Sequence, residues 1–470
     1  MGTEFTYVGK RLPSISAVDK ALGKVKYSID IKLPGALIGK ILTSPHAHAL
    51  IKSIDTSEAE KLPGVAAVVT FKDIPKKLVN PGVLKFMHYH PANDIEDMYI
   101  MAGDKVRYVG EIVAAVAAVD EATAVEALKL IKVDYEVLPA TYNPIDAMKP
   151  GSAKVHENAE NNISQTFSFP GNRGDVDAAF AEADVQVELD VSTSRQHMMT
   201  LEPLSCTAYY DRQKRELTCW TPNQRPITIR KQLAELFDMP EGKINIICEY
   251  AGGFFGEGNF PIVPVCVTLA KKVSKPVRLE YTREEHIMET PSREVYLISG
   301  KLAFKKDGTL LAGTQNLTVD SGAYFNRSNA TSVPCMGSFQ GNYRMPVFKG
   351  EMKAVYSNTP TTSGSRGYGT PQALFILEQL MDMAAEKLGM DRLEIRKKNF
   401  KRMGEYAIQH PMETETQERV MMLGAEKIGW EQKKSRNKED GVWRHGIGMC
   451  NYFDVTGGQP RERMDRQCMM

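Results

Sequence analysis

Apolar and polar residues alternate along this chain with two different periods, and each period predicts a different kind of element. A period of two, typical of half-buried strands, is clearest in residues 184–194, 295–305 and 310–324. Residues 105–118 are predicted to form two strands, joined as a hairpin that turns at Gly110. Together with the helices, these strands predict an α+β fold.

Apolar residues spaced three and four positions apart predict helices in other segments. Residues 120–131 form such a segment, and Asp120 is placed to cap its first turn. Residues 227–237 and 260–272 show the same spacing, and residues 374–389 show it most strongly.

Shifts in composition predict four successive regions. Residues 1–140 combine short strands and helices in one compact unit, and residues 141–162, rich in Pro, Gly, Asn and charge, are predicted to be a linker. Residues 163–430 hold most of the longer strands and helices and are predicted to be a second domain. Residues 431–470 begin with a charged segment, followed by the strand-like residues 445–455, and are predicted to start a further region.

Composition and charge exclude several classes of function. Of the 470 residues, 42% are hydrophobic and 25% are charged, and the net charge of +1 provides no basic surface for nucleic acid or anionic lipid. The N-terminus lacks the apolar core of a signal peptide, and no run approaches the roughly 18 apolar residues of a membrane span. The seven cysteines include no C-x-x-C pair, which argues against a self-contained iron–sulfur or zinc site. We therefore predict a cytoplasmic protein with reduced thiols.

Two glycine-rich stretches, YAGGFFGEG (250–258) and TTSGSRGYGTPQA (361–373), each precede a predicted helix. Helix N-termini bind phosphate, but neither stretch contains the G-K-[ST] of a P-loop. The dinucleotide pattern G-x-G-x-x-G also fails, because its third glycine falls on Pro261. Two interpretations remain: each glycine serves only a tight turn, or both loops bind one large polar ligand through backbone amides.

Six stretches in the same order resemble the xanthine oxidase family of molybdenum hydroxylases. AGGFFGEG resembles the family loop G-G-G-F-G-G, and SGSRGYGTPQA is similar to A-F-R-G-F-G-x-P-Q-A. The remaining stretches are HMMTLEP, CWTPNQRP, VDSGAY and residues 17–55, which resemble the family's hammerhead domain. The resemblance implies an N-terminal α/β hammerhead domain followed by a mixed α/β molybdopterin-binding domain.

The resemblance implies a molybdenum–pterin cofactor, expected in a dinucleotide form, that hydroxylates a substrate with water as the oxygen source. Gln224 matches the glutamine whose amide contacts an oxygen ligand of the metal, and it is a predicted catalytic and metal-contacting residue. Phe254 matches the residue whose backbone N–H contacts the metal's oxo group. Gly252 and Gly253 are predicted to bind the cofactor, because side chains there are expected to exclude it.

The second loop carries the other predicted cofactor residues. Arg366 matches the family arginine beside the metal and is predicted to act in catalysis and cofactor binding, with Gly367 next to it. Tyr368 occupies the place of a phenylalanine that stacks on aromatic substrates. Ser365 departs from the family's usual aromatic residue, which predicts a more open or more polar pocket wall.

The charged pair that binds purines in some family members is missing here. Its two places match Gly258 and Pro334 in this chain. Glu257 is close by, either lining the substrate channel or simply solvated on its loop. Loss of both charges favours a simple aromatic, N-heterocyclic or aldehyde substrate over a xanthine-type one.

The family's Gln-Gly pterin loop and its G-x-G-E segment, which carries the catalytic base, do not occur in this sequence. We therefore expect a split subunit, similar to the large molybdopterin subunit of nicotinate dehydrogenase. Residues 431–470 are then expected to start the second molybdopterin-binding region, which another chain completes. The predicted partners are a second molybdopterin subunit, a 2Fe-2S subunit and an FAD subunit. The alternatives are a truncated subunit, a non-catalytic scaffold and an independent nucleotide-dependent dehydrogenase.

Overall fold

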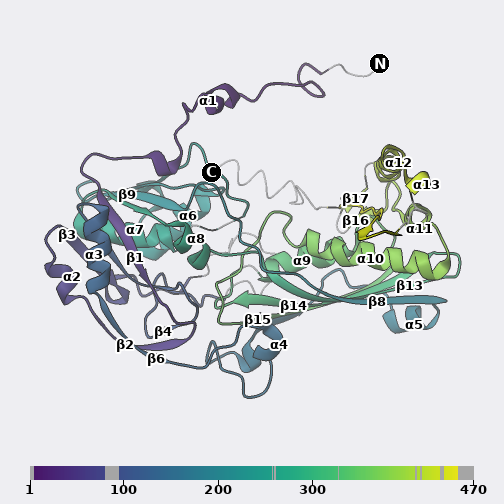
Figure 1. Ribbon diagram of the computed structural model, residues 1–470, viewed down its shortest axis with the longest axis horizontal. Coiled ribbons are helices and arrows are strands. Elements are labelled where there is room, and N and C mark those ends of the chain that lie inside the picture. The colour runs from purple at the N-terminus through teal and green to yellow at the C-terminus, as the bar shows by residue number, and fades with distance from the viewer. Residues whose placement is uncertain are drawn as a thin grey trace. The chain divides into compact units, whose positions relative to one another are not determined.

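The computed structural model of the chain describes residues 5–79, 95–256, 258, 261–326, 328–407, 410–412, 415–433 and 439–453. These residues form two compact units, shown as a ribbon in Figure 1. Each unit combines segments that are distant in the sequence. The first unit contains Met1–Pro81, Met98–Leu138 and Met198–Thr290, and the second contains Gly82–Asp97, Pro139–His197 and Pro291–Met470.

A seven-stranded mixed sheet forms the centre of the first unit. Its strand order is β11-β10-β9-β12-β1-β5-β3, and β1 pairs with β12 in parallel although more than 200 residues separate them. Every residue of β5 is buried, because the strand lies between β1 and β3 under covering helices. The strands are β1 (Leu37–Thr43), β3 (Val65–Thr70), β5 (Ile112–Ala118), β9 (Ser205–Asp211), β10 (Glu216–Trp220), β11 (Ile244–Ile247) and β12 (Val277–Glu280).

The hairpin predicted in residues 105–118 is wrong. β4 (Lys105–Val106) pairs with β2 (Ala49–Asp55) in a small sheet completed by β6 (Lys132–Val137), whereas β5 belongs to the large sheet. Gly110 does not form a hairpin turn; a Cβ there would lie 2.8 Å from the Met288 carbonyl oxygen. The glycine is therefore required by close packing against another segment of the same unit.

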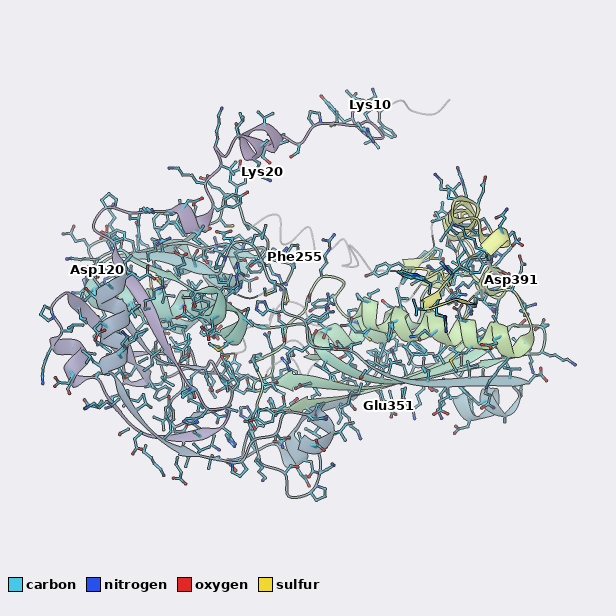
Figure 2. The ribbon with its side chains drawn as sticks, in the orientation of Figure 1. Lys10, Lys20, Asp120, Phe255, Glu351 and Asp391 are labelled. Atoms are coloured by element: carbon cyan, nitrogen blue, oxygen red, sulfur yellow. The ribbon has the colours of Figure 1, made fainter. Side chains whose placement is uncertain are left out.

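Three helices of the first unit begin and end close to the predicted residues 120–131, 227–237 and 260–272. α3 (Glu121–Leu130) starts after Asp120, whose carboxylate accepts the Thr123 N–H at 2.8 Å (Figure 2). α7 (Ile262–Val273) is buried from Ile262 to Ala270, as expected for a helix under a sheet. The others are α1 (Ala17–Ala21), α2 (Ser57–Lys61), α6 (Pro226–Phe237) and α8 (Arg283–Glu289), with 3-10 turns at Ser28–Asp30, Phe71–Asp73 and Glu241–Lys243.

The second unit is built on a five-stranded sheet with the order β7-β15-β14-β13-β8. The predicted pair of long strands is confirmed, since β13 and β14 form an antiparallel ladder. α9 (Ser328–Gln340) and α10 (Thr370–Leu388) cover one face, and α4 (Pro144–Ala147) and α5 (Val176–Ala181) lie on the other (Figure 1). The strands are β7 (Ile163–Ser168), β8 (Val185–Ser192), β13 (Val295–Phe304), β14 (Leu310–Gly322) and β15 (Val347–Tyr356).

Residues 445–453 are not a strand, contrary to the sequence prediction. The Asn451 N–H donates to the buried Glu378 carboxylate at 3.1 Å, and Ile447 and Met449 pack against the core of the second unit. Side-chain contacts thus replace a sheet ladder here. The unit also contains α11 (Arg392–Asn399), α12 (Thr416–Ile428), α13 (Trp430–Lys433), a 3-10 turn at Glu160–Asn162, and the short pairs β16 (Tyr406–Ala407) with β17 (His410–Pro411) and β18 (Glu439–Asp440) with β19 (Trp443–Arg444).

The predicted linker, residues 141–162, contains buried residues such as Val155 and Asn162. The Asn162 amide donates to the carbonyl oxygens of Ala147 and Ala153, so this segment is folded onto itself. The domain boundaries at residues 140, 162 and 430 remain predictions. Among the described residues, no helix combines the length and apolar character needed to cross a membrane.

Candidate functional site

Two loops of the first unit leave the same edge of the large sheet. β10 and β11 run parallel, with Trp220 opposite Ile247, so the loops that follow them begin side by side. The Thr221 N–H donates to the Ile247 carbonyl at 3.2 Å, and the Asn223 N–H points to the Cys248 sulfur at 3.3 Å. These contacts bring the Gln224 loop and the first glycine loop together.

Gln224 is exposed in the short loop between β10 and α6. Around it the backbone is constrained, since the Arg225 N–H donates to the Asn223 side chain and Pro226 begins the helix. In the described part of the chain, the Gln224 amide has no hydrogen-bond partner. A fixed backbone therefore presents a free amide group.

Phe254 lies in the loop that follows β11, with its side chain 5% exposed. Its backbone N–H has no acceptor among the described residues. On either side, Gly253 at φ +113° and Gly256 at φ +101° hold backbone conformations that favour glycine. The loop thus buries a phenyl ring and leaves the N–H of the same residue available.

Phe255, which replaces a family glycine, has φ +48° and a ring that is 42% exposed (Figure 2). A non-glycine residue in this conformation costs roughly 1 kcal/mol. The ring approaches Gly253, because a Cβ on that glycine would lie 3.3 Å from the Phe255 ring. Phe255 therefore places an aromatic surface beside the loop, where the resemblance provided no role for it.

Gly252 is also required by packing within the chain, and its role at the cofactor stays a prediction. A Cβ on Gly252 would lie 2.5 Å from the Glu202 Cβ, so the protein's own glutamate already excludes a side chain. The Glu202 carboxylate accepts the Gly252 N–H at 2.6 Å. Burial raises the pKa of the Glu202 carboxyl, although the N–H groups of Gly252 and Ile29 act in the opposite direction.

The second glycine loop belongs to the second unit and precedes α10. Arg366 is exposed, and the Arg293 guanidinium donates to its carbonyl oxygen at 2.7 Å. The Arg366 guanidinium itself pairs with no described residue. Gly367 has φ +93°, and a Cβ on Gly369 would lie 2.3 Å from the Thr331 carbonyl oxygen, which makes glycine necessary at both positions.

Tyr368 also adopts a left-handed conformation, with φ +47°, and its N–H donates to the Ser365 carbonyl at 2.7 Å. Its ring packs on Gly364, where a Cβ would lie 2.2 Å from the Tyr368 ring. Ser365 is buried, and the more open or more polar pocket wall expected from it stays a prediction.

The remaining predicted substrate residues belong to different segments of the chain. Pro334 is partly buried inside α9, the helix whose Thr331 and Cys335 contact Gly369. Gly258 follows the first glycine loop and has open space where a side chain would be. Glu257 lies outside the described residues.

Sequence reasoning missed Gln372, the third residue of α10. It is 3% exposed, and neither atom of its amide has a hydrogen-bond partner in the described part of the chain. Such buried unpaired amides are costly unless a ligand satisfies them. Within the second unit, Gln372 therefore offers a buried polar group that fits a polar ligand. The P-Q-A of the family motif was the available signal.

Comparison with known proteins identifies the family. Residues 155–400 match the model of a molybdopterin cofactor-binding domain, and residues 22–139 match the hammerhead domain of aldehyde oxidase and xanthine dehydrogenase. The chain belongs to the xanthine oxidase family of molybdenum hydroxylases. The predicted α+β fold, its hammerhead and molybdopterin-binding domains, and the molybdenum–pterin cofactor class are confirmed.

Individual relatives differ in how much of their length this chain matches. It is 35% identical to a probable xanthine dehydrogenase component of Bacillus subtilis over 82% of this chain, and it spans about half of that protein, 49%. It is 32% identical to the nicotinate dehydrogenase large molybdopterin subunit of Eubacterium barkeri, over 86% of this chain and 92% of that subunit. The aldehyde oxidoreductase of Desulfovibrio gigas superimposes with a TM-score of 0.84 and 29% identity, over 92% of this chain and 47% of that one.

Proposed function

We propose that this chain is the cofactor-binding part of a molybdenum-dependent hydroxylase or dehydrogenase. The substrate class is aromatic, N-heterocyclic or aldehyde, and electrons pass to iron–sulfur and flavin subunits. One observation carries the proposal: loops from adjacent parallel strands present, at one sheet edge, the Gln224 amide and the Phe254 N–H, which have no partner among the described residues.

When bound, the molybdenum–pterin supplies the transfer of a water-derived oxygen to carbon and accepts two electrons. Within this chain, the Gln224 amide and the Phe254 N–H would hold the polar ligands of the metal in a fixed orientation. The Arg366 guanidinium would donate to anionic groups of the cofactor. The buried Gln372 amide would bind a polar part of the same cofactor.

The proposed substrate class rests on two uncharged residues, which stand where purine-binding members of the family have charged ones. Pro334 and Gly258 carry no charge, so a purine held by a carboxylate and a guanidinium finds neither at these positions. Tyr368, two residues after Arg366 in the sequence, keeps an aromatic ring, which suits a planar or apolar substrate.

We propose that the partner is a second molybdopterin-binding polypeptide. This chain matches 92% of the length of the nicotinate dehydrogenase large molybdopterin subunit, which is itself one subunit of a larger enzyme. An apolar arm supports this proposal. Residues 5–24 extend away from the sheet of their own unit (Figure 1), and none of them is buried. Their exposed large apolar side chains are Phe5, Tyr7, Val8, Leu12, Ile15, Val18 and Leu22.

The experiment that tests the function is gentle affinity purification of the full chain from its own cells. Mass spectrometry of the co-purifying chains and elemental analysis of molybdenum are then run on the same sample. About one molybdenum per chain, with a co-purifying polypeptide that carries the G-x-G-E segment, supports the proposal. A metal-free chain that purifies alone overturns it and favours a scaffold.

Replacing both Leu12 and Ile15 with aspartate is expected to reduce recovery of the partner at least tenfold. Two charges would enter an apolar contact at a cost of several kcal/mol. Both side chains are exposed in the isolated chain, so its melting temperature should not change. Val137→Asp, at an exposed position on β6, is the control. Equal partner recovery from all three proteins would remove the arm from the interface.

Arg366→Ala is expected to lower the molybdenum content of the purified complex about tenfold, because a charged partner of the cofactor is lost. The molybdenum content of Arg366→Lys should lie between those of Arg366→Ala and the unchanged protein, since lysine keeps the charge but not the planar set of donors. Arg419→Ala, which removes an exposed arginine from α12, is the matched control. Molybdenum content is measured by elemental analysis, and equal content in Arg366→Ala and the control would contradict the assignment.

A further inference from the structure

Glu202 connects two segments that are far apart in the sequence. Its side chain is buried, and its two carboxylate oxygens accept different backbone groups, the Gly252 N–H at 2.6 Å and the Ile29 N–H at 3.1 Å. In the opposite direction, the Glu202 N–H donates to the Gly252 carbonyl at 3.3 Å. Both polar groups of the Gly252 backbone are therefore bound by one residue.

Glu202 is itself held firmly by its neighbours. The Thr200 hydroxyl donates to the Glu202 carbonyl at 2.7 Å. From α8, the Arg283 guanidinium donates to the carbonyl oxygens of Thr200 and Leu201, at 2.7 and 2.9 Å. Because the segment 200–202 is bound from several sides, the carboxylate has a fixed position from which to hold the loop.

Glu202 and Thr200 also pack closely against the backbone of the glycine loop. A Cβ on Gly252 would lie 2.5 Å from the Glu202 Cβ, and a Cβ on Gly253 would lie 3.3 Å from Thr200. Glycine at 252 therefore allows the glutamate to approach the backbone. Two residues further on is Phe254, whose N–H has no acceptor in the described part of the chain.

We infer that Glu202 is a positioning residue, whose carboxylate holds the Gly252 backbone and so aims the Phe254 N–H at the cofactor. The inference rests on the proposed function for its last step. A donor stabilises a charged ligand best when its direction is fixed before the ligand binds. Both carboxylate oxygens accept backbone N–H groups, so Glu202 acts on the backbone of its neighbours.

The test compares Glu202→Ala, Glu202→Gln and the control Glu111→Gln. Glu111 is a buried glutamate of the same unit whose carboxylate accepts the Arg107 N–H at 2.6 Å. It directly precedes β5, which lies near the opposite edge of the large sheet from β11. Hydrogen–deuterium exchange is measured on the cofactor-free full chain, in a peptide covering residues 248–256. Molybdenum content is measured on the complex purified from cells.

Glu202→Ala is expected to speed exchange in this peptide at least tenfold and to lower molybdenum content about tenfold. Glu202→Gln should be intermediate in both, because its amide oxygen still accepts one N–H while its NH2 group cannot accept the other. If Glu202→Ala fails to fold, Glu202→Gln alone decides. The control should match the unchanged protein in both measurements.

Two results would overturn the inference. The first is loop exchange in the Glu202 variants equal to that of the control. The second is faster loop exchange together with full molybdenum content, which would leave Glu202 a role in folding only. Failure of the proposed function gives a different result, because the protein without any substitution would then contain no molybdenum. In that case the exchange measurement still decides whether Glu202 holds the loop.

Discussion

Gln224→Ala is expected to lower the turnover of the assembled enzyme about 100-fold, as removal of one preorganised donor does in other active sites. Gln224 is exposed and makes no hydrogen bond within the described part of the chain, so the fold loses nothing with it. The melting temperature and the recovery of partner chains should therefore stay unchanged. Turnover is measured on the purified complex with an aromatic aldehyde and an artificial electron acceptor.

The matched control is Gln213→Ala, in the turn between β9 and β10 of the same unit. It removes the same side chain at the opposite end of β10 from the Gln224 loop. Turnover equal to that of the control would remove Gln224 from the site. A loss of assembly along with turnover would also contradict the prediction, because it would show a structural role.

Arg396→Met is expected to reduce the free energy of unfolding by about 3–5 kcal/mol, because it leaves a buried carboxylate without its countercharge. The Arg396 side chain is fully buried and donates to Glu378 at 2.9 Å and to Asp382 at 2.7 Å. Burial alone lowers the pKa of Arg396, but the Glu378 carboxylate raises it above its usual value. The measurement is urea unfolding followed by circular dichroism.

Two further variants make this prediction specific. Arg392→Met, on the same helix, removes a half-exposed arginine 3.6 Å from Asp382, and it should change stability by less than about 1 kcal/mol. Adding Glu378→Met to Arg396→Met should recover part of the lost stability, since the unpaired charge is removed. If Arg392→Met and Arg396→Met lower the free energy of unfolding equally, the prediction for the buried Arg396–Glu378 pair is wrong.

The Arg396 network also explains how residues 445–453 are held. Glu378 accepts the Tyr343 hydroxyl at 2.7 Å and the Asn451 N–H at 3.1 Å, and the Asn451 amide donates to the Tyr343 hydroxyl at 3.2 Å. The apolar alternation in this segment predicted a strand, but these side-chain contacts fix it without one. Arg396→Met should therefore also speed amide exchange at Asn451.

Local signals identified four of the longer helices. α3, α6, α7 and α10 were all predicted from apolar spacing, and for α3 the capping residue was correct as well. Contacts within one helical turn determine these features, so a short stretch of sequence contains them. α9 was missed because Pro334 and many small polar residues hide its period, and packing on the sheet and on α10 compensates.

Some of the candidate functional residues could likewise be found from the sequence, and one could be found only from the structure. Gln224, Phe254, Arg366 and Tyr368 stand in motifs whose order is visible along the chain, so a resemblance was enough to select them. Their roles remain proposals. Glu202 could not be selected, because its importance depends on a contact with Gly252, 50 residues further along the chain.

By itself the sequence determined the family, the cofactor class, the α+β composition and the positions of four of the longer helices. Each of these depends on residue types at short spacing or on ordered motifs. Only the tertiary structure decided that β1 pairs with β12, that β4 and β5 join different sheets, and that Glu202 holds the glycine loop. These are contacts between segments tens to hundreds of residues apart, and they are chosen by packing of the whole unit.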